Sequence, residues 1–186
     1  MRTLNYKYFA PTALDMEIRP MFQSVLTNKL AAFLSSIGLD TVPQRLDGEC
    51  FLPGIHIEKG KILVDEAKLI YPGDLLHEAG HLAVAPANVR PALSGDIEIP
   101  GADMDAVEVQ ATAWAFAAIV HLGLEPRVLF HEGGYEGKSE GLIRTYSYGV
   151  YPGAHKLQEF GMTAFGETAR RLKVAPYPHM LKWTRD

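Results

Sequence analysis

Cysteine is almost absent from this chain of 186 residues, in which Cys50 is the only one. A single cysteine excludes an internal disulfide and a zinc cluster built on thiolates. Long apolar runs are missing too, because even the stretch 111–120 is too short to span a bilayer. Residues 1–20 mix charged and apolar side chains and lack the apolar core of a signal peptide. These absences favour a cytoplasmic protein.

An excess of positive charge is also missing. The 18 lysines and arginines are outnumbered by 22 aspartates and glutamates, which gives a net charge of −4. This balance excludes the broad basic face with which proteins bind nucleic acid. The hydrophobic share of 47% and the charged share of 22% are those of an ordinary soluble domain. We therefore expect one domain, residues 1–186, that folds without disulfides.

Apolar spacing and turn residues predict a mixed α+β chain. Helical periodicity predicts a first helix within residues 20–37. The runs 55–58 and 61–65 are short and rich in β-forming residues. They flank the pair Lys59 and Gly60, and this pattern predicts a β-hairpin.

Two strong helices are expected next. Asp74 is a suitable N-cap for the first of them, which Pro86 ends. The second begins at Asp103 or Asp105 and stops near Gly123. This second helix is apolar along most of its length, which predicts burial.

The last third of the sequence is less regular. Residues 132–153 are rich in glycine and tyrosine, which predicts irregular or weakly stranded structure. A final amphipathic helix is expected over residues 154–172. Residues 176–186 are expected to lie on the surface.

The sequence His77-Glu78-Ala79-Gly80-His81 is an H-E-x-x-H motif on the predicted helix that follows Asp74. Residues four apart share one helix face, so both imidazoles can reach one ion at about 2.1 Å, the Zn–N distance. Glu78 can then act as general base toward a water at an open coordination position. The alternative is a pair of histidines that only form hydrogen bonds in the core or face solvent.

A catalytic zinc ion takes three protein ligands, so one more is required. Glu108 is the best candidate, because it is a lone carboxylate near the start of an otherwise apolar helix. The alternative is an exposed Glu108 that only interacts favourably with the helix dipole. Other candidates for the third ligand are Asp96, Glu98 and Asp105.

Two histidines on one helix and a glutamate on the next resemble the gluzincin metallopeptidases, and in particular the short ImmA/IrrE-type family. The resemblance covers about residues 55–123. It is carried by the strand 60–65, by the helix motif from His77 to His81, and by Glu108 with Ala111, Trp114 and Ala115 after it.

This resemblance implies a minimal zincin-like α+β domain, in which several helices, one of them the motif helix, pack with a small sheet. It further implies that His77, His81 and Glu108 bind zinc, that Glu78 is the general base, and that the substrate is a peptide or protein. One departure concerns Thr112, which stands where that family usually has asparagine. Its hydroxyl can still form a hydrogen bond with a ligand histidine.

A peptidase also needs a hydrogen-bond donor for the negative charge that develops on the substrate oxygen. The glycine- and tyrosine-rich segment 131–155 offers several, and sequence order does not choose among them. These candidates are His131, Arg144, Tyr146, Tyr148, Tyr151 and His155.

Taken together, these features predict a zinc-dependent metallopeptidase. Three alternatives keep the zinc: a hydrolase of a small amide, a regulatory module that binds a protein partner, and a structural zinc site. A wide cleft would favour peptides over small amides, and the presence of Glu78 argues against a purely regulatory module. A fourth protein ligand, such as His155 or Asp105, would indicate a structural site.

Overall fold

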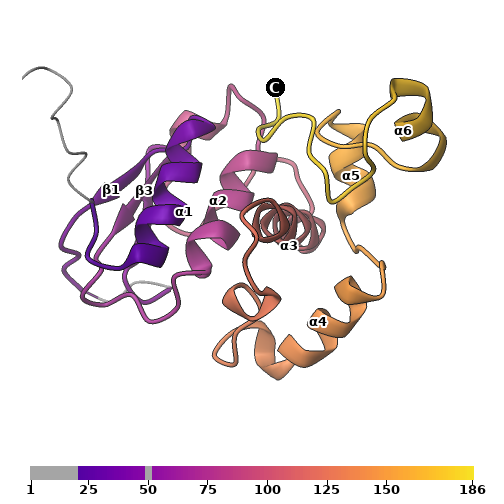
Figure 1. The fold of residues 1–186 in the computed structure, drawn as a ribbon. Coiled ribbons are helices and arrows are strands. Elements are labelled where there is room, and N and C mark those ends of the chain that lie inside the picture. The colour runs from indigo at the N-terminus through magenta and orange to yellow at the C-terminus, as the bar shows by residue number, and fades with distance from the viewer. Residues whose placement is uncertain (1–20, 49–51) are drawn as a thin grey trace, which may run out of the picture.

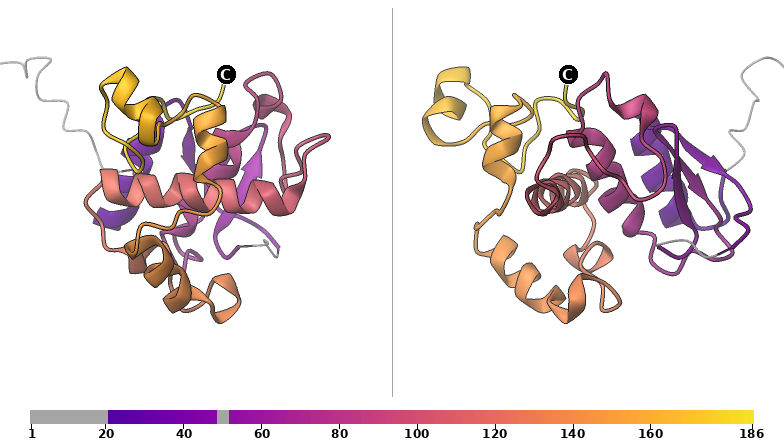
Figure 2. Two further views of the ribbon diagram at one scale, coloured as in Figure 1. Left: turned by 90° about the vertical axis from the view of Figure 1, so that its right-hand side faces the viewer. Right: turned by 180° about the vertical axis from the view of Figure 1, so that it is seen from behind.

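The computed structural model describes residues 21–48 and 52–186, and it shows the mixed α+β fold that the sequence predicts (Figure 1). Helix α3 (Met104–His121) runs through the middle of the molecule, with a small sheet and two helices on one side and the C-terminal helices on the other (Figure 2). Predictions made on residues 1–20 and on Cys50 lie outside the described residues.

The first helix and the sheet form the N-terminal layer. Helix α1 (Val25–Ser36) begins after Ser24, whose hydroxyl accepts a hydrogen bond from the N–H of Thr27. The sheet has the order β1-β3-β2, with β1 (Thr41–Pro43) parallel to β3 (Lys61–Val64) and β2 (Ile55–Glu58) antiparallel to it.

Strands β2 and β3 are the predicted hairpin. Lys59 and Gly60 at its turn both have positive φ angles, of 49° and 73°, as the tightest hairpin turns require. Strand β1 was not predicted, because it is only three residues long and ends on Pro43, which has no N–H to donate.

Helix α2 (Asp74–Val84) carries the H-E-x-x-H motif. The predicted N-cap was wrong by one residue, since Gly73 occupies that position and Asp74 is the first helical residue. Glycine is required at 73, because a Cβ there would lie 1.7 Å from the carbonyl oxygen of Val128. The carboxylate of Asp74 is instead engaged by His131, at 2.7 Å from Oδ1 to Nε2.

Helix α3 was predicted to begin at either Asp103 or Asp105. Asp103 is the N-cap, and its side chain accepts a hydrogen bond from the N–H of Asp105. The short helix η1 (Arg90–Ala92) lies in the connection between α2 and α3. None of the described helices has the length and apolar character needed to cross a lipid bilayer.

Residues 132–153 are more helical than predicted. After η2 (Pro126–Val128) the chain forms a short turn of helix, η3 (Tyr135–Gly137), and then α4 (Ser139–Ser147). The prediction of irregular or weakly stranded structure was therefore wrong for this segment. The many glycines and tyrosines in this segment made helix α4 difficult to predict. Its N-terminus is fixed by hydrogen bonds from the Ser139 hydroxyl to two backbone carbonyls.

The predicted last helix is divided into α5 (Ala154–Glu159) and α6 (Gly166–Leu172). The chain leaves the helical path at Gly161, which has a φ angle of 68°. The side chain of Leu172, at the end of α6, is exposed.

The prediction that residues 176–186 lie on the surface was wrong for several of them. Tyr177 and Met180 are buried. The carbonyl oxygen of Trp183 accepts a hydrogen bond of 2.7 Å from the indole N–H of Trp114 on α3. This segment therefore closes the core that α1, the sheet, α2 and α3 share.

Candidate metal centre

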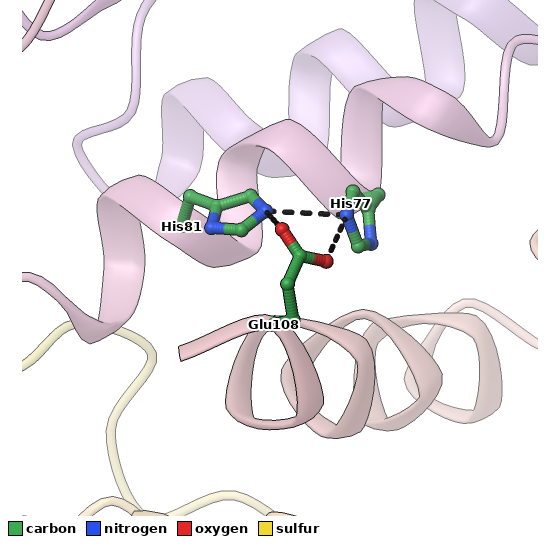
Figure 3. Close-up of side chains that lie close together, drawn as sticks. All are labelled: His77, His81 and Glu108. Carbon is green, nitrogen blue, oxygen red and sulfur yellow. Dashed lines mark hydrogen bonds and ion pairs between the residues drawn. The ribbon is translucent and has the colours of Figure 1, made fainter. Parts of the chain in front are cut away.

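Three side chains from α2 and α3 converge at one point (Figure 3). The Nε2 atom of His77 lies 3.3 Å from one carboxylate oxygen of Glu108, and Nε2 of His81 lies 3.1 Å from the other. The two Nε2 atoms are themselves 3.2 Å apart. The ligand atoms needed for a metal site are thus brought together as the sequence predicts.

These spacings can be compared with those of a tetrahedral zinc ion. Bonds of about 2.0–2.2 Å at tetrahedral angles place neighbouring ligand atoms about 3.4 Å apart. The three distances of 3.1, 3.2 and 3.3 Å among the two nitrogens and the carboxylate fall just below that value. Two histidines with a glutamate are also a donor set that catalytic zinc sites use. The residues present therefore fit a zinc ion.

Close contact between the two helices makes this convergence possible. Gly80 lies on the side of α2 that faces α3, where an added Cβ would come within 2.6 Å of the carbonyl oxygen of Ala111. A larger residue at 80 would push the helices apart and separate Glu108 from the two imidazoles. Gly80 is thus the residue that allows α2 and α3 to pack closely.

Charge at the centre is concentrated on Glu108. Hydrogen bonds from the imidazoles of His77 and His81 hold the pKa of this carboxyl well below its usual range. Glu108 is thus an anion at any physiological pH, which is the form that binds a metal cation. His81 is buried, while Glu108 remains half exposed toward a cavity.

Glu78 lines the same cavity beside His77. Burial raises the pKa of its carboxyl from 4.5 to about 7, the nearby His77 lowers it, and the carboxylates of Glu108, Asp74 and Asp96 raise it further. A group with a pKa near 7 can both accept and release a proton under neutral conditions. The environment of Glu78 therefore suits an acid–base role.

The cavity has a volume of about 1140 Å³. Its lining includes residues of strand β2 and residues 95–97, together with residues 133–136 and 138 and side chains of α4. The three candidate ligand side chains and Glu78 line the same cavity. The centre is thus open to a molecule much larger than water.

The other candidates for metal ligands lie outside the group. Asp96 and Asp105 line the cavity, but neither contributes an atom to the cluster formed by His77, His81 and Glu108. Glu98 and His155 neither belong to this cluster nor line the cavity. Among the described residues, three candidate ligands converge, and the fourth that a structural site would need is not among them.

The outer nitrogens of the two histidines have no partner within residues 21–48 and 52–186. Both Nδ1 atoms are buried without a hydrogen bond there, although metal-bound histidines usually donate from this second nitrogen.

Thr112 is buried and lines the cavity. Its hydroxyl could form a hydrogen bond with a ligand histidine, but this bond is not present.

Most of the predicted oxyanion donors do not reach the cavity. Of the six, only Tyr146 lines it, and its hydroxyl already donates to the carbonyl of Pro152 at 3.2 Å. His131 is buried behind the wall, where it contacts Asp74 and stacks on Tyr71 with ring centroids 3.7 Å apart. The remaining four, which are not in the lining, are Arg144, Tyr148, Tyr151 and His155.

The sequence analysis missed Tyr135. Its side chain lines the cavity, and its ring meets that of His77 edge-on at 5.9 Å between centroids. A signal was present in the sequence, where Tyr135 stands directly after Gly133 and Gly134 and shortly before Gly137. Such a glycine-flanked aromatic residue often marks a loop with an unusual backbone conformation.

Comparison of the chain with protein-family models, with curated proteins and with solved structures found no match. The resemblance to the ImmA/IrrE-type peptidases therefore rests on the sequence motifs quoted above.

Proposed function

We propose that this protein is a zinc-dependent peptidase, in which His77, His81 and Glu108 hold the metal and Glu78 is the general base. One observation carries the proposal: the two imidazole Nε2 atoms lie 3.2 Å apart, each lies 3.1–3.3 Å from a carboxylate oxygen of Glu108, and all three side chains line an open cavity. That spacing matches the ligand set of a catalytic zinc ion, which has three protein ligands and one open position.

The chemistry divides between the ion and the chain. A zinc ion at such a centre supplies a Lewis acid and lowers the pKa of a coordinated water from 15.7 to about 7. Glu78 accepts the proton of the attacking water and later delivers it to the amine nitrogen that leaves. The burial that raises the pKa of Glu78 to about 7 suits both steps, because neither protonation state is then strongly favoured.

The shape of the cavity supports a peptide rather than a small amide as the substrate. Pockets for small molecules have volumes of about 300–1000 Å³ and enclose most of their ligand. The cavity here is larger, at about 1140 Å³, and stretches from strand β2 to helix α4. Apolar side chains suited to a peptide line it, among them Leu52, Ile55, Ile57, Ile97 and Leu142.

A relationship with the zincin-like ImmA/IrrE-type peptidases is part of this proposal. Ala111, Trp114 and Ala115, which carry the resemblance beyond the metal-binding residues, are all fully buried on α3. Their burial explains why small and aromatic residues at these positions accompany Glu108, since they set how α3 packs.

The two rival zinc proteins are less well supported. A structural site needs a fourth protein ligand, and the part of the chain described here supplies three. A regulatory module has no use for a carboxylate of raised pKa in the cavity beside the centre, which is the position of Glu78.

Metal content and peptide cleavage test the proposal together. The zinc-loaded protein is expected to contain one zinc per chain and to cleave members of a quenched fluorescent peptide library. Glu78→Gln should retain the zinc and lose about 10²–10⁴-fold in kcat, the usual contribution of a general base. Glu98→Gln is a matched change outside the cavity, and it should retain both the zinc and the wild-type kcat.

Full activity in Glu78→Gln would contradict the assigned role of this residue. A wild-type protein that binds zinc stoichiometrically but cleaves no peptide would favour the regulatory module.

A further inference from the structure

Tyr135 has a buried hydroxyl that forms no hydrogen bond within the described part of the chain. This is unusual, because buried polar atoms almost always have a partner. Burial, and after it the nearby carboxylates of Asp74, Glu108 and Glu78, raise the pKa of this phenol well above its usual range. The hydroxyl therefore keeps its proton at neutral pH, and no acceptor among the described residues receives it.

The backbone at this position is strained as well. Tyr135 and Glu136 have φ angles of 55° and 52°, in the left-handed region that glycine adopts most easily. Glycines stand close by at 133, 134 and 137, yet the strained positions carry side chains. Strain of this kind persists only where the surrounding structure enforces it, and it is concentrated at functional sites.

One contact joins the segment around Tyr135 to helix α2, and two hydrogen bonds within the segment support it. His131 contacts the carboxylate of Asp74, the first residue of α2. The Ser139 hydroxyl donates to the carbonyl of His131 at 2.5 Å, and the N–H of Lys138 donates to the carbonyl of Tyr135 at 2.9 Å. Tyr135 is thus fixed to the helix that carries His77, Glu78 and His81.

From these observations we infer that Tyr135 is a catalytic residue whose hydroxyl donates a hydrogen bond to the substrate carbonyl oxygen as that oxygen gains negative charge. The inference rests on the proposed peptidase function. The missing acceptor for the hydroxyl is then the substrate itself, and the strained backbone serves to hold the ring in the cavity wall beside His77.

Two other donors in the cavity wall are already engaged. Tyr146 donates to the carbonyl of Pro152, and the ammonium group of Lys138 is paired with Glu136 at 2.6 Å. Tyr135 differs from both, because its hydroxyl has no partner among residues 21–48 and 52–186.

Tyr135→Phe tests the inference, because it removes the hydroxyl and keeps the ring. With the zinc-loaded protein and a peptide that the wild type cleaves, we expect kcat to fall about 10²–10³-fold, as when an oxyanion donor is lost. KM should change little, because the bond strengthens only as charge develops. The melting temperature of the metal-free variant should stay the same or rise, because a buried hydroxyl without a partner has been removed.

Tyr177→Phe is the matched control. This buried tyrosine lies outside the cavity, and its hydroxyl donates to the carbonyl of Ala113 at 2.9 Å. We expect the control to lower the melting temperature and to leave kcat unchanged, the reverse of the pattern for Tyr135→Phe.

The outcomes separate this inference from the proposed function. If the wild type cleaves peptides and Tyr135→Phe retains its kcat, the role of Tyr135 is wrong and the peptidase stands. If Tyr135→Phe loses kcat and melting temperature together, its hydroxyl is structural and the inference is again overturned. If the zinc-loaded wild type cleaves no peptide, the proposed function fails, and the role of Tyr135 fails with it.

Discussion

Helices α2 and α3 meet in two regions of opposite chemistry. In the first, Gly80 touches the backbone of α3, and alanines such as Ala79 and Ala115 are fully buried. In the second, two imidazoles and a carboxylate crowd together, and Glu78 is held in surroundings that disfavour its charge. The first region stabilises the packing of the two helices. The second region lowers the stability of the fold, and the first compensates for that loss.

The difference explains how a small protein can tolerate such a polar cluster. Close packing of small residues gives two rigid helices a fixed spacing, so the polar groups cannot relax away from one another. Functional sites commonly lower stability in this way, and the rest of the fold compensates. Three substitutions test this division, and they are given in order of decreasing expected effect.

The packed region is the more sensitive to change. Gly80→Val should lower the free energy of unfolding by about 4 kcal/mol, above the common range of about 1–3 kcal/mol for overpacking. The reason is that a Cβ at 80 meets the backbone oxygen of Ala111 at 2.6 Å, which cannot move aside as a flexible side chain could. Urea unfolding of the metal-free protein measures the change.

Gly141→Val on helix α4 is the matched control, because nothing lies within 4 Å of a Cβ at that position. Valine and glycine differ little in helix propensity, so we expect a change within about 0.5 kcal/mol. Equal effects of the two substitutions would show that helix propensity, rather than the contact with α3, decides the result.

The polar region should be stabilised by metal. At a zinc concentration 100 times its Kd, the free energy of unfolding of the wild type should rise by about 2.7 kcal/mol. This corresponds to a rise of about 8 °C in melting temperature. In Glu108→Ala this gain should nearly vanish at the same zinc concentration, because the third ligand is gone. Thermal melts with zinc and with a chelator provide the measurement.

Asp105→Ala is the control for this experiment, since Asp105 lines the same cavity from the same helix but lies outside the cluster. This variant should keep the rise in melting temperature that zinc causes in the wild type. An Asp105→Ala protein without that gain, or a Glu108→Ala protein that retains it, would mean that the third ligand has been misassigned.

Glu78 should lower the stability of the metal-free protein at neutral and alkaline pH. Its pKa is raised from 4.5 to about 7 by burial, so between these values the folded protein binds a proton that the unfolded chain releases. Wild-type stability should therefore fall as the pH rises from 4.5 to 7. Such a shift corresponds to about 3 kcal/mol, which we reduce to about 2 kcal/mol because Glu78 is partly exposed to solvent.

Glu78→Gln does not titrate and supplies the comparison. Its stability should be close to that of the wild type near pH 4.5 and about 2 kcal/mol higher above pH 7, by urea unfolding in the presence of a chelator. A difference that does not vary with pH would show that the carboxyl of Glu78 is not perturbed by burial.

The cluster of His77, His81 and Glu108 could be predicted because it depends on local spacing. A separation of four residues on a helix fixes the two imidazoles on one face, and a lone carboxylate on an apolar helix needs a partner. The hairpin around Gly60 could be predicted for a similar reason, since a two-residue turn defines it. In each case the determining interactions lie within a few residues.

The features that could not be predicted depend on contacts between distant segments. Gly73 replaces Asp74 as the N-cap because Val128 approaches it and His131 engages the aspartate. The glycines around Tyr135 indicate an unusual loop, but they do not show that its side chain lines the cavity or that its hydroxyl is buried without a partner among the described residues. These properties come from contacts outside either stretch of sequence.

The contact of the C-terminal segment with the helix pair also has a practical consequence. The chain has 2 tryptophans, and both lie at this junction, with the rings of Trp114 and Trp183 packed edge to face at 5.5 Å. The backbone N–H of Arg185 also donates to the carbonyl of Ala83 near the end of α2. Intrinsic fluorescence is therefore a built-in optical reporter of the junction between α2, α3 and the C-terminal segment, and can follow its loosening without any added label.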